Sequence, residues 1–117
     1  MTRNLQTVLV VDDDESMRML CRVNLELEGY RVLEAGTVES AISQLGEDGI
    51  DVVLLDVHVG GGDGFGVLEH VHGQRVALFT GSLEVGPEHR ERVDAVLTKP
   101  FTLPQLSSTV AHLAGAR

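Results

Sequence analysis

Acidic side chains follow two apolar runs of the chain at the point where each run stops. Asp12–Asp14 follow the run at residues 8–11, and Asp56 ends the run that begins at residue 52. The only lysine, Lys99, stands at the end of a later run. Because the carboxyl ends of parallel strands meet at one edge of a sheet, we expect these side chains to lie together. Together they predict a site for a divalent metal and a phosphoryl group.

Carboxylates gathered at one point repel each other and bind protons more tightly, unless a positive charge lies between them. Mg²⁺ would resolve this repulsion because it prefers oxygen ligands and keeps positions for water and a phosphoryl oxygen. One carboxylate can then attack a phosphoryl group, while Lys99 supplies a second positive charge and Thr80, which ends another run, supplies a hydroxyl. The expected cofactor is therefore Mg²⁺.

Composition limits the classes of function. A chain of 117 residues is expected to form a single domain. Its net charge of -9 argues against nucleic-acid binding and favours basic proteins or cations as partners. The single cysteine, Cys21, excludes an internal disulfide and is predicted to be a small buried side chain. No apolar run reaches the ~20 residues of a membrane span, so we expect no membrane contact and a cytoplasmic protein.

The elements that must position these residues alternate along the sequence. Each short apolar run is followed by a stretch compatible with a helix, which predicts an α/β fold with a doubly wound, five-stranded parallel sheet. The predicted strands cover residues 7–11, 31–34, 51–56, 76–80 and 94–98.

Several signals mark the helices. Thr37 is predicted to cap the second helix, and Pro87 suits the first position of a shortened fourth helix of one to two turns. The last helix is expected over residues 102–113, and the glycine-rich stretch at 60–64 is expected to be a flexible turn. In the first helix, apolar residues recur at helical spacing: Met17, Leu20, Cys21 and Leu25.

In this order and at strand ends, these residues resemble the CheY-like receiver domain of two-component response regulators over nearly the whole chain. The resemblance implies a flavodoxin-like (β/α)5 fold with strand order 2-1-3-4-5. The features that match are the acidic pair Asp12-Asp13, Asp56 with Gly64 eight residues on, Thr80-Gly81, and Lys99-Pro100-Phe101.

The resemblance also implies a role for each residue. Asp56 would be the phosphorylated side chain, and Lys99 would pair with the phosphoryl group or, at rest, with Asp56. Thr80 would supply the hydroxyl that approaches the phosphoryl group. The implied metal ligands are Asp13 directly, Asp12 mainly through water, Asp56, and the backbone carbonyl of His58. Asp14 falls outside the acidic pair and is expected to be a solvated loop acid near the entrance of the site.

The chain departs from the pattern of the family in two motifs and in the shortened fourth helix, which lies on the face that receivers usually present to partners. Val59-Gly60 replaces the usual methionine-proline after the phosphoacceptor, which should loosen that loop because glycine is freer than proline. Val96 replaces the usual aromatic residue three positions before the lysine, so signalling must proceed without rotation of that ring.

The expected function is that of a phosphoacceptor module, and not of an enzyme. A sensor histidine kinase or phosphotransfer protein would supply the phosphoryl group, and the downstream protein target stays unnamed. We expect residues 1–117 to be one receiver domain with no output domain in this chain, as a monomer or weak dimer. The alternatives are a phosphate sink, the receiver portion of a longer hybrid kinase and, least favoured, a phosphohydrolase with an aspartyl nucleophile.

Overall fold

A computed structural model describes residues 6–47, 49–59, 62–81 and 86–115. Its main sheet is parallel and five-stranded, in the order β2-β1-β3-β6-β7. This order is the predicted one, since β6 and β7 are the fourth and fifth strands of that sheet along the chain. The strands are β1 (Thr7–Val11), β2 (Arg31–Ala35), β3 (Val52–Asp56), β6 (Arg75–Thr80) and β7 (Ala95–Thr98).

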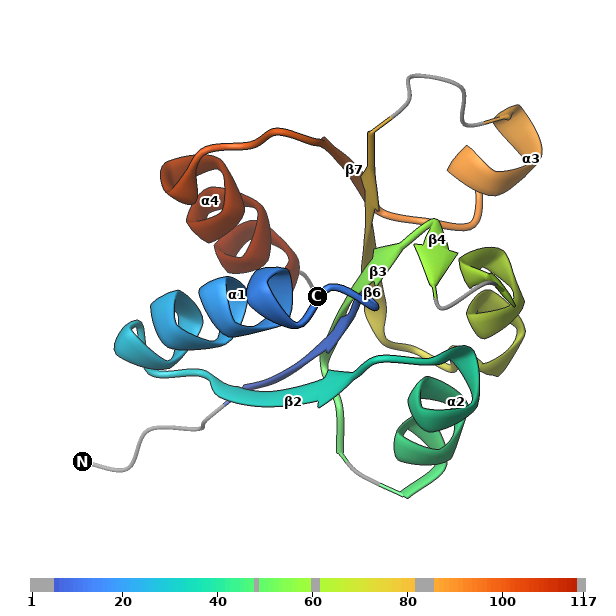
Figure 1. Cartoon of the computed structure of the whole chain (residues 1–117), viewed down its shortest axis with the longest axis horizontal. Helices are drawn as coiled ribbons and strands as arrows, with labels where there is room; N and C mark the ends of the chain where they lie inside the picture. The colour runs from blue at the N-terminus through green and yellow to red at the C-terminus, as the bar shows by residue number, and fades with distance from the viewer. Residues whose placement is uncertain (1–5, 48, 60–61, 82–85, 116–117) are drawn as a thin grey trace.

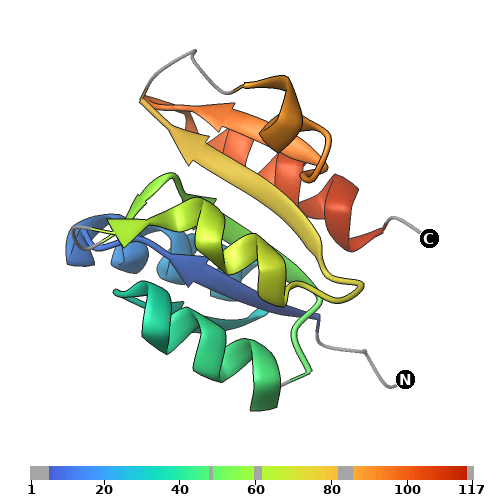
Figure 2. The same ribbon diagram turned by 90° about the vertical axis from the view of Figure 1, so that its right-hand side faces the viewer.

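Helices cover both faces of the sheet (Figure 1). On one face lie α1 (Glu15–Leu27) and α4 (Leu103–Ala114), which pack side by side. On the other face lie α2 (Val38–Glu47) and the 3₁₀ helix η1 (Gly64–His70), with α3 (Pro87–Arg90) beside β7 (Figures 1 and 2). The predicted doubly wound α/β architecture is therefore confirmed.

The core consists of two layers, one on each face of the sheet. Alternate residues of a strand point to opposite faces, so Val8 and Val10 face α1 and α4, whereas Leu9 and Val11 face α2 and η1. Every residue of β1 and β3 is buried. Burial on both faces explains why these strands appear in the sequence as continuous apolar runs that stop where the sheet reaches solvent.

The helix signals agree with the structure in most places. The Thr37 hydroxyl accepts a hydrogen bond from the Ser40 amide, and Thr102 forms a full capping box with Gln105 at the start of α4. Pro87 is the first residue of α3, which has only four residues, as the short-helix prediction requires. Cys21 is buried as predicted, and burial raises the pKa of its thiol to about 12.

Two local features differ from expectation. The segment after β3 is more than a turn, because β4 (His58–Val59) pairs antiparallel with β5 (Gly62–Asp63); residues 60–61 lie outside the described residues. Asp14 is exposed, as expected of a solvated acid, but it also has a structural role. Its carboxylate accepts hydrogen bonds from the Ser16 and Met17 amides and caps α1, because the first amides of a helix have no partner within the helix.

No helix within the described ranges combines the length and the hydropathy that a bilayer crossing requires.

Candidate functional site

Four strands bring the predicted site residues to one edge of the sheet. Asp12 directly follows β1, Asp56 is the last residue of β3, Thr80 is the last residue of β6, and Lys99 directly follows β7. Asp12, Asp56 and Thr80 are buried, whereas Asp13 is exposed. One carboxylate oxygen from each of Asp12, Asp13 and Asp56 lies within 4.8 Å of the other two. The structure thus brings together the acids that the sequence predicts at this edge.

Lys99 joins the two buried acids. Its Nζ lies 3.0 Å from Oδ2 of Asp12 and 3.5 Å from Oδ2 of Asp56. The Lys99 amide donates to the Thr80 carbonyl over 2.7 Å, which ties the lysine backbone to the end of β6. At rest the lysine therefore contacts both acids and is closer to Asp12, whereas the resemblance implied pairing with Asp56.

The surroundings of the site raise the pKa of both Asp56 and Lys99. Burial raises the pKa of Asp56, and the neighbouring Asp12 carboxylate raises it further, although Lys99 and the His58 amide act in the opposite direction. Burial alone would lower the pKa of Lys99, but the hydrogen bond and the charge of Asp12, together with Asp56, raise it. Lys99 therefore does not cancel the effects of burial and of the Asp12 charge on the pKa of Asp56.

This donor set suits a hard divalent cation. Three carboxylates converge and all the donors are oxygens. The Asp12 charge also helps to raise the pKa of Asp56, and a cation between the two acids would act against that repulsion. Within the part of the chain that the structure describes, Asp12, Asp13 and Asp56 are the three side chains of metal-binding type that lie close enough together to share one ion.

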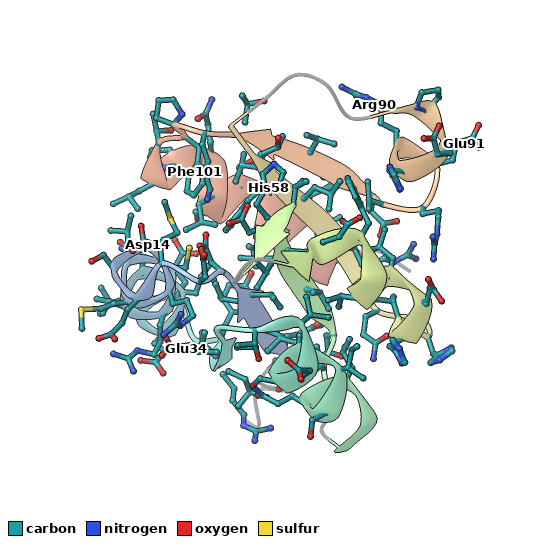
Figure 3. The ribbon with its side chains drawn as sticks, turned by 45° about the vertical axis from the view of Figure 1, so that its right-hand side comes forward. Asp14, Glu34, His58, Arg90, Glu91 and Phe101 are labelled. Atoms are coloured by element: carbon teal, nitrogen blue, oxygen red, sulfur yellow. The ribbon has the colours of Figure 1, made fainter. Side chains whose placement is uncertain are left out.

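The remaining predicted residues surround this cluster. His58 lies on β4 with an exposed side chain, and its amide donates to Oδ1 of Asp56 over 3.3 Å. Figure 3 shows Asp14 at the start of α1 and His58 at the end of the sheet nearer to Phe101. Val96 is half-buried and packs against the core layer that contains α2 and η1, in the place where the family usually has an aromatic ring.

Gly64 has a steric role that the sequence alone did not explain. A Cβ atom at this position would lie 2.1 Å from the backbone oxygen of Asp56 and 2.9 Å from that of Val57. The Gly64 amide also donates to the Val57 carbonyl over 2.8 Å. Only a residue without a side chain lets the start of η1 pack against the backbone of Asp56 in this way.

Gly64→Ala is therefore expected to lower the free energy of unfolding by about 1–3 kcal/mol, because the added methyl group must displace the backbone of Asp56. Urea denaturation of the purified variant measures this change. The matched control is Gly66→Ala in the same helix, where a Cβ would meet nothing within 4 Å. The control should stay within about 0.5 kcal/mol of the wild type. Equal stability of the two variants would contradict the steric account.

Sequence reasoning missed Arg18 as a neighbour of the site. Its Nη1 donates to the backbone oxygen of Asp12 over 2.7 Å, and its Nε pairs with Oε1 of Glu34 over 3.1 Å. Arg22, one helical turn further on, also pairs with Glu34. The available signal was Glu34 among the apolar residues near the end of β2, together with two arginines four residues apart on the preceding helix.

Comparisons with known proteins agree with this geometry. The sequence model of the response regulator receiver domain family matches residues 8–111 of the chain. The chain is 31% identical over 110 residues to the alkaline phosphatase synthesis transcriptional regulatory protein PhoP of Bacillus subtilis, covering 88% of this chain and 46% of that protein. It is also 31% identical over 121 residues to the sensory/regulatory protein RpfC of Xanthomonas campestris, covering 92% of this chain and 16% of that protein. It therefore spans less than half the length of either relative.

The fold also matches solved structures. A CheY-like response regulator receiver domain from Methanospirillum hungatei superposes with a TM-score of 0.84, at 24% identity, over 93% of each chain. At this identity the match demonstrates a common fold.

Proposed function

Because the chain belongs to the response regulator receiver domain family, we propose that it accepts a phosphoryl group on Asp56 from a phosphohistidine of a sensor histidine kinase or phosphotransfer protein. The observation that carries this proposal is the position of the Asp56 carboxylate. It is buried at the sheet edge, within 4.8 Å of acidic oxygens from Asp12 and Asp13, and 3.5 Å from the Lys99 ammonium. A nucleophilic carboxylate with adjacent cationic groups is what phosphoryl transfer requires.

In the proposed reaction, a carboxylate oxygen of Asp56 forms a bond to phosphorus as the bond from phosphorus to the donor nitrogen breaks. The electron pair of the broken bond stays on the imidazole of the donor. Lys99 is close enough to move from the Asp12 carboxylate towards a phosphoryl oxygen, because its Nζ already lies between the two acids. The Thr80 hydroxyl, at the end of the neighbouring strand, is the proposed donor of a hydrogen bond to another phosphoryl oxygen.

Mg²⁺ is the proposed cofactor. Asp12, Asp13, Asp56 and the backbone carbonyl of His58 would hold it, with Asp12 acting mainly through water. When bound, the ion would neutralise part of the charge of the incoming phosphoryl group, which brings about two negative charges into an acidic pocket.

Labelling with a small phosphodonor tests this function. Wild-type protein with acetyl phosphate and Mg²⁺ is expected to gain one acid-stable, base-labile phosphoryl group, without continuous release of phosphate. A phosphohydrolase would instead turn over continuously. Its aspartate pair would be Asp12 and Asp14, but Asp14 caps α1 in the structure. Steady turnover without a stable phosphoprotein would contradict the receiver function.

A longer natural protein is the second candidate, because the chain matches 46% of its PhoP relative and 16% of its RpfC relative. In that case the chain would be the receiver portion of a hybrid kinase, or its phosphorylation would control a further domain. A phosphate sink would use the same chemistry without a downstream partner. Phosphorylation-dependent capture of a target protein would distinguish a signalling receiver from a sink.

The proposed phosphodonor docks on α1. Large apolar side chains are exposed on this helix at Met19, Leu20 and Val23, around a depression of about 310 Å³ that Ser16 and Asn24 complete. Leu20, which has helical spacing with the buried residues, is 42% exposed. The helix starts beside the acidic cluster, so a protein bound here would lie next to Asp56. The chain has a net charge of -9, which favours a donor surface with basic residues around its apolar contacts.

Leu20→Glu is expected to lower the rate of phosphotransfer from a cognate histidine kinase at least about tenfold, because it places a charge in the apolar contact. Labelling by acetyl phosphate, which needs no docking surface, should stay at the wild-type rate. Parallel time courses with the two donors measure both rates. An equal loss with both donors would show damage to the site, and no loss with either would place the docking surface elsewhere.

A further inference from the structure

Arg18 connects α1 to the backbone of the acidic cluster. Its side chain is only 17% exposed, and its Nη1 donates to the backbone oxygen of Asp12 over 2.7 Å. A hydrogen bond from a charged guanidinium is stronger than one between neutral groups. The contact reaches the backbone of Asp12 and does not involve the side chains of the predicted site.

The carbonyl that Arg18 binds belongs to the peptide group between Asp12 and Asp13. The other backbone contact of Asp12 lies on its opposite side, where its amide donates to the Ala35 carbonyl over 3.1 Å. Asp12 is therefore held at both its amide and its carbonyl. Rotation of the peptide between the two acids would change the direction of both carboxylates. Arg18 opposes that rotation.

The guanidinium is itself held in place. Glu34 on β2 binds Arg18 Nε over 3.1 Å and Arg22 Nη1 over 3.2 Å, and the Gln44 side chain donates to the Glu34 backbone oxygen over 2.7 Å. Figure 3 places Glu34 beside α1. A Cβ at Gly36 would lie 3.0 Å from Arg18 Nη1, so the absence of a side chain there leaves room for the guanidinium.

We propose that Arg18 is a positioning residue for the cation site, one that fixes the peptide between Asp12 and Asp13 so that their carboxylates converge with Asp56. This inference rests on the proposed function, since it assumes that the acidic cluster binds Mg²⁺. Arg18 acts here through the backbone and touches neither the cation nor the phosphoryl group. The Glu34 carboxylate pairs with the Arg18 guanidinium and offsets its charge. Arg18 therefore affects the acidic cluster through its hydrogen bond to the Asp12 carbonyl more than through its charge.

Arg22 provides a matched control. It lies on the same helix and pairs with the same Glu34 carboxylate, and this ion pair does not involve the backbone of Asp12. Arg18→Met and Arg22→Met therefore both disrupt the ion pairs of Glu34, and only Arg18→Met removes the bond to the Asp12 carbonyl. Arg18→Lys adds a third comparison, because it keeps the charge and loses the forked geometry.

Calorimetric titration with Mg²⁺, together with the ¹³C chemical shift of the Asp12 carbonyl, tests the inference. Arg18→Met is expected to weaken Mg²⁺ binding about tenfold or more, in the range of partners that orient metal ligands, and to shift the carbonyl signal. Arg22→Met should bind Mg²⁺ within about twofold of the wild type, because the ion pair between Arg22 and Glu34 does not involve the Asp12 backbone. Arg18→Lys should lose affinity like Arg18→Met, and it serves as the test variant if Arg18→Met does not fold.

Equal Mg²⁺ affinity in the Arg18 and Arg22 variants, whether both are weakened or neither, would overturn the positioning role. The result is separate from the fate of the proposed function. If wild-type protein binds Mg²⁺ but accepts no phosphoryl group, the proposed function fails while the affinity comparison still decides the role of Arg18.

Discussion

Asp56→Asn is expected to abolish phosphorylation by acetyl phosphate and by a cognate histidine kinase. The side-chain amide has a similar shape but lacks the anionic oxygen that would attack phosphorus. The neighbouring acids should not substitute, because Asp12 is engaged by Lys99 and by the Asp14 amide. Intact-protein mass spectrometry under acidic conditions measures the mass gain. A variant that still gains one phosphoryl group would contradict the assignment of Asp56.

The same variant should remain folded and should be more stable than the wild type at neutral pH in buffer with EDTA. The pKa of Asp56 is raised above its ordinary value of 3.8, chiefly by burial, so the folded state binds this proton more tightly than the unfolded chain. The ionised carboxylate therefore destabilises the fold above its folded-state pKa. As the pH falls through that pKa towards 3.8, the penalty disappears, and the two proteins should converge.

Urea denaturation at several pH values measures this difference. A wild type that is more stable than Asp56→Asn at neutral pH, without metal, would show that the carboxylate is better compensated than burial and the Asp12 charge indicate.

Asp13→Asn is expected to lose most Mg²⁺ binding and, with it, labelling by acetyl phosphate. Asp13 supplies the exposed oxygen of the three-carboxylate group, and an amide oxygen is a weaker ligand for Mg²⁺ than a carboxylate oxygen. The expected loss of affinity is about tenfold or more, by analogy with the loss of a partner at other metal sites. EDTA should abolish labelling of the wild type in the same assay.

Asp14→Asn is the control for this substitution. It removes the same charge one residue further on, and asparagine caps helices about as well as aspartate, so α1 should remain intact. Labelling of Asp14→Asn should therefore stay close to the wild-type rate. If Asp13→Asn and Asp14→Asn lose labelling to the same extent, labelling depends on the total negative charge of this loop and does not depend on Asp13 as a specific ligand. Labelling of Asp13→Asn at the wild-type rate would exclude the proposed ligand.

The fold could be predicted from the sequence because parallel strands that are buried on both faces must be apolar throughout. The run at 52–55 shows this, since it ends at Asp56, where the backbone reaches the edge of the sheet. Resemblance to a known family then supplied the strand order, which the lengths of the runs alone do not determine. The approach of Asp12, Asp56 and Lys99 followed from the same rule about strand ends.

Other features could not be predicted because they depend on contacts between distant parts of the chain. The bond from Arg18 to the Asp12 carbonyl requires Glu34 to orient the guanidinium, and spacing along α1 does not reveal it. The spacing of Leu20 also fits a buried helix face, but the helix turns this side chain outwards. Asp14, in contrast, precedes a helix start, so capping preference was a usable signal for its role.

Aromatic contacts show the same limit. The His89 ring of α3 stacks on Phe65 of η1, with ring centroids 3.6 Å apart. Nothing in the local sequence of either segment predicts this pair. The two rings belong to residues that are more than twenty positions apart in the sequence, one in η1 and the other in α3.

The central claim is that Asp56 is the phosphoacceptor, and peptide mapping tests it most directly. Wild-type protein is treated with acetyl phosphate and Mg²⁺, the acyl phosphate is reduced with borohydride to the corresponding alcohol, and tandem mass spectrometry locates the altered residue. We predict one reduced position, Asp56, that is absent when EDTA replaces Mg²⁺. Reduction at Asp12 or Asp13 instead, or a phosphoryl group on a residue outside the acidic cluster, would contradict the account.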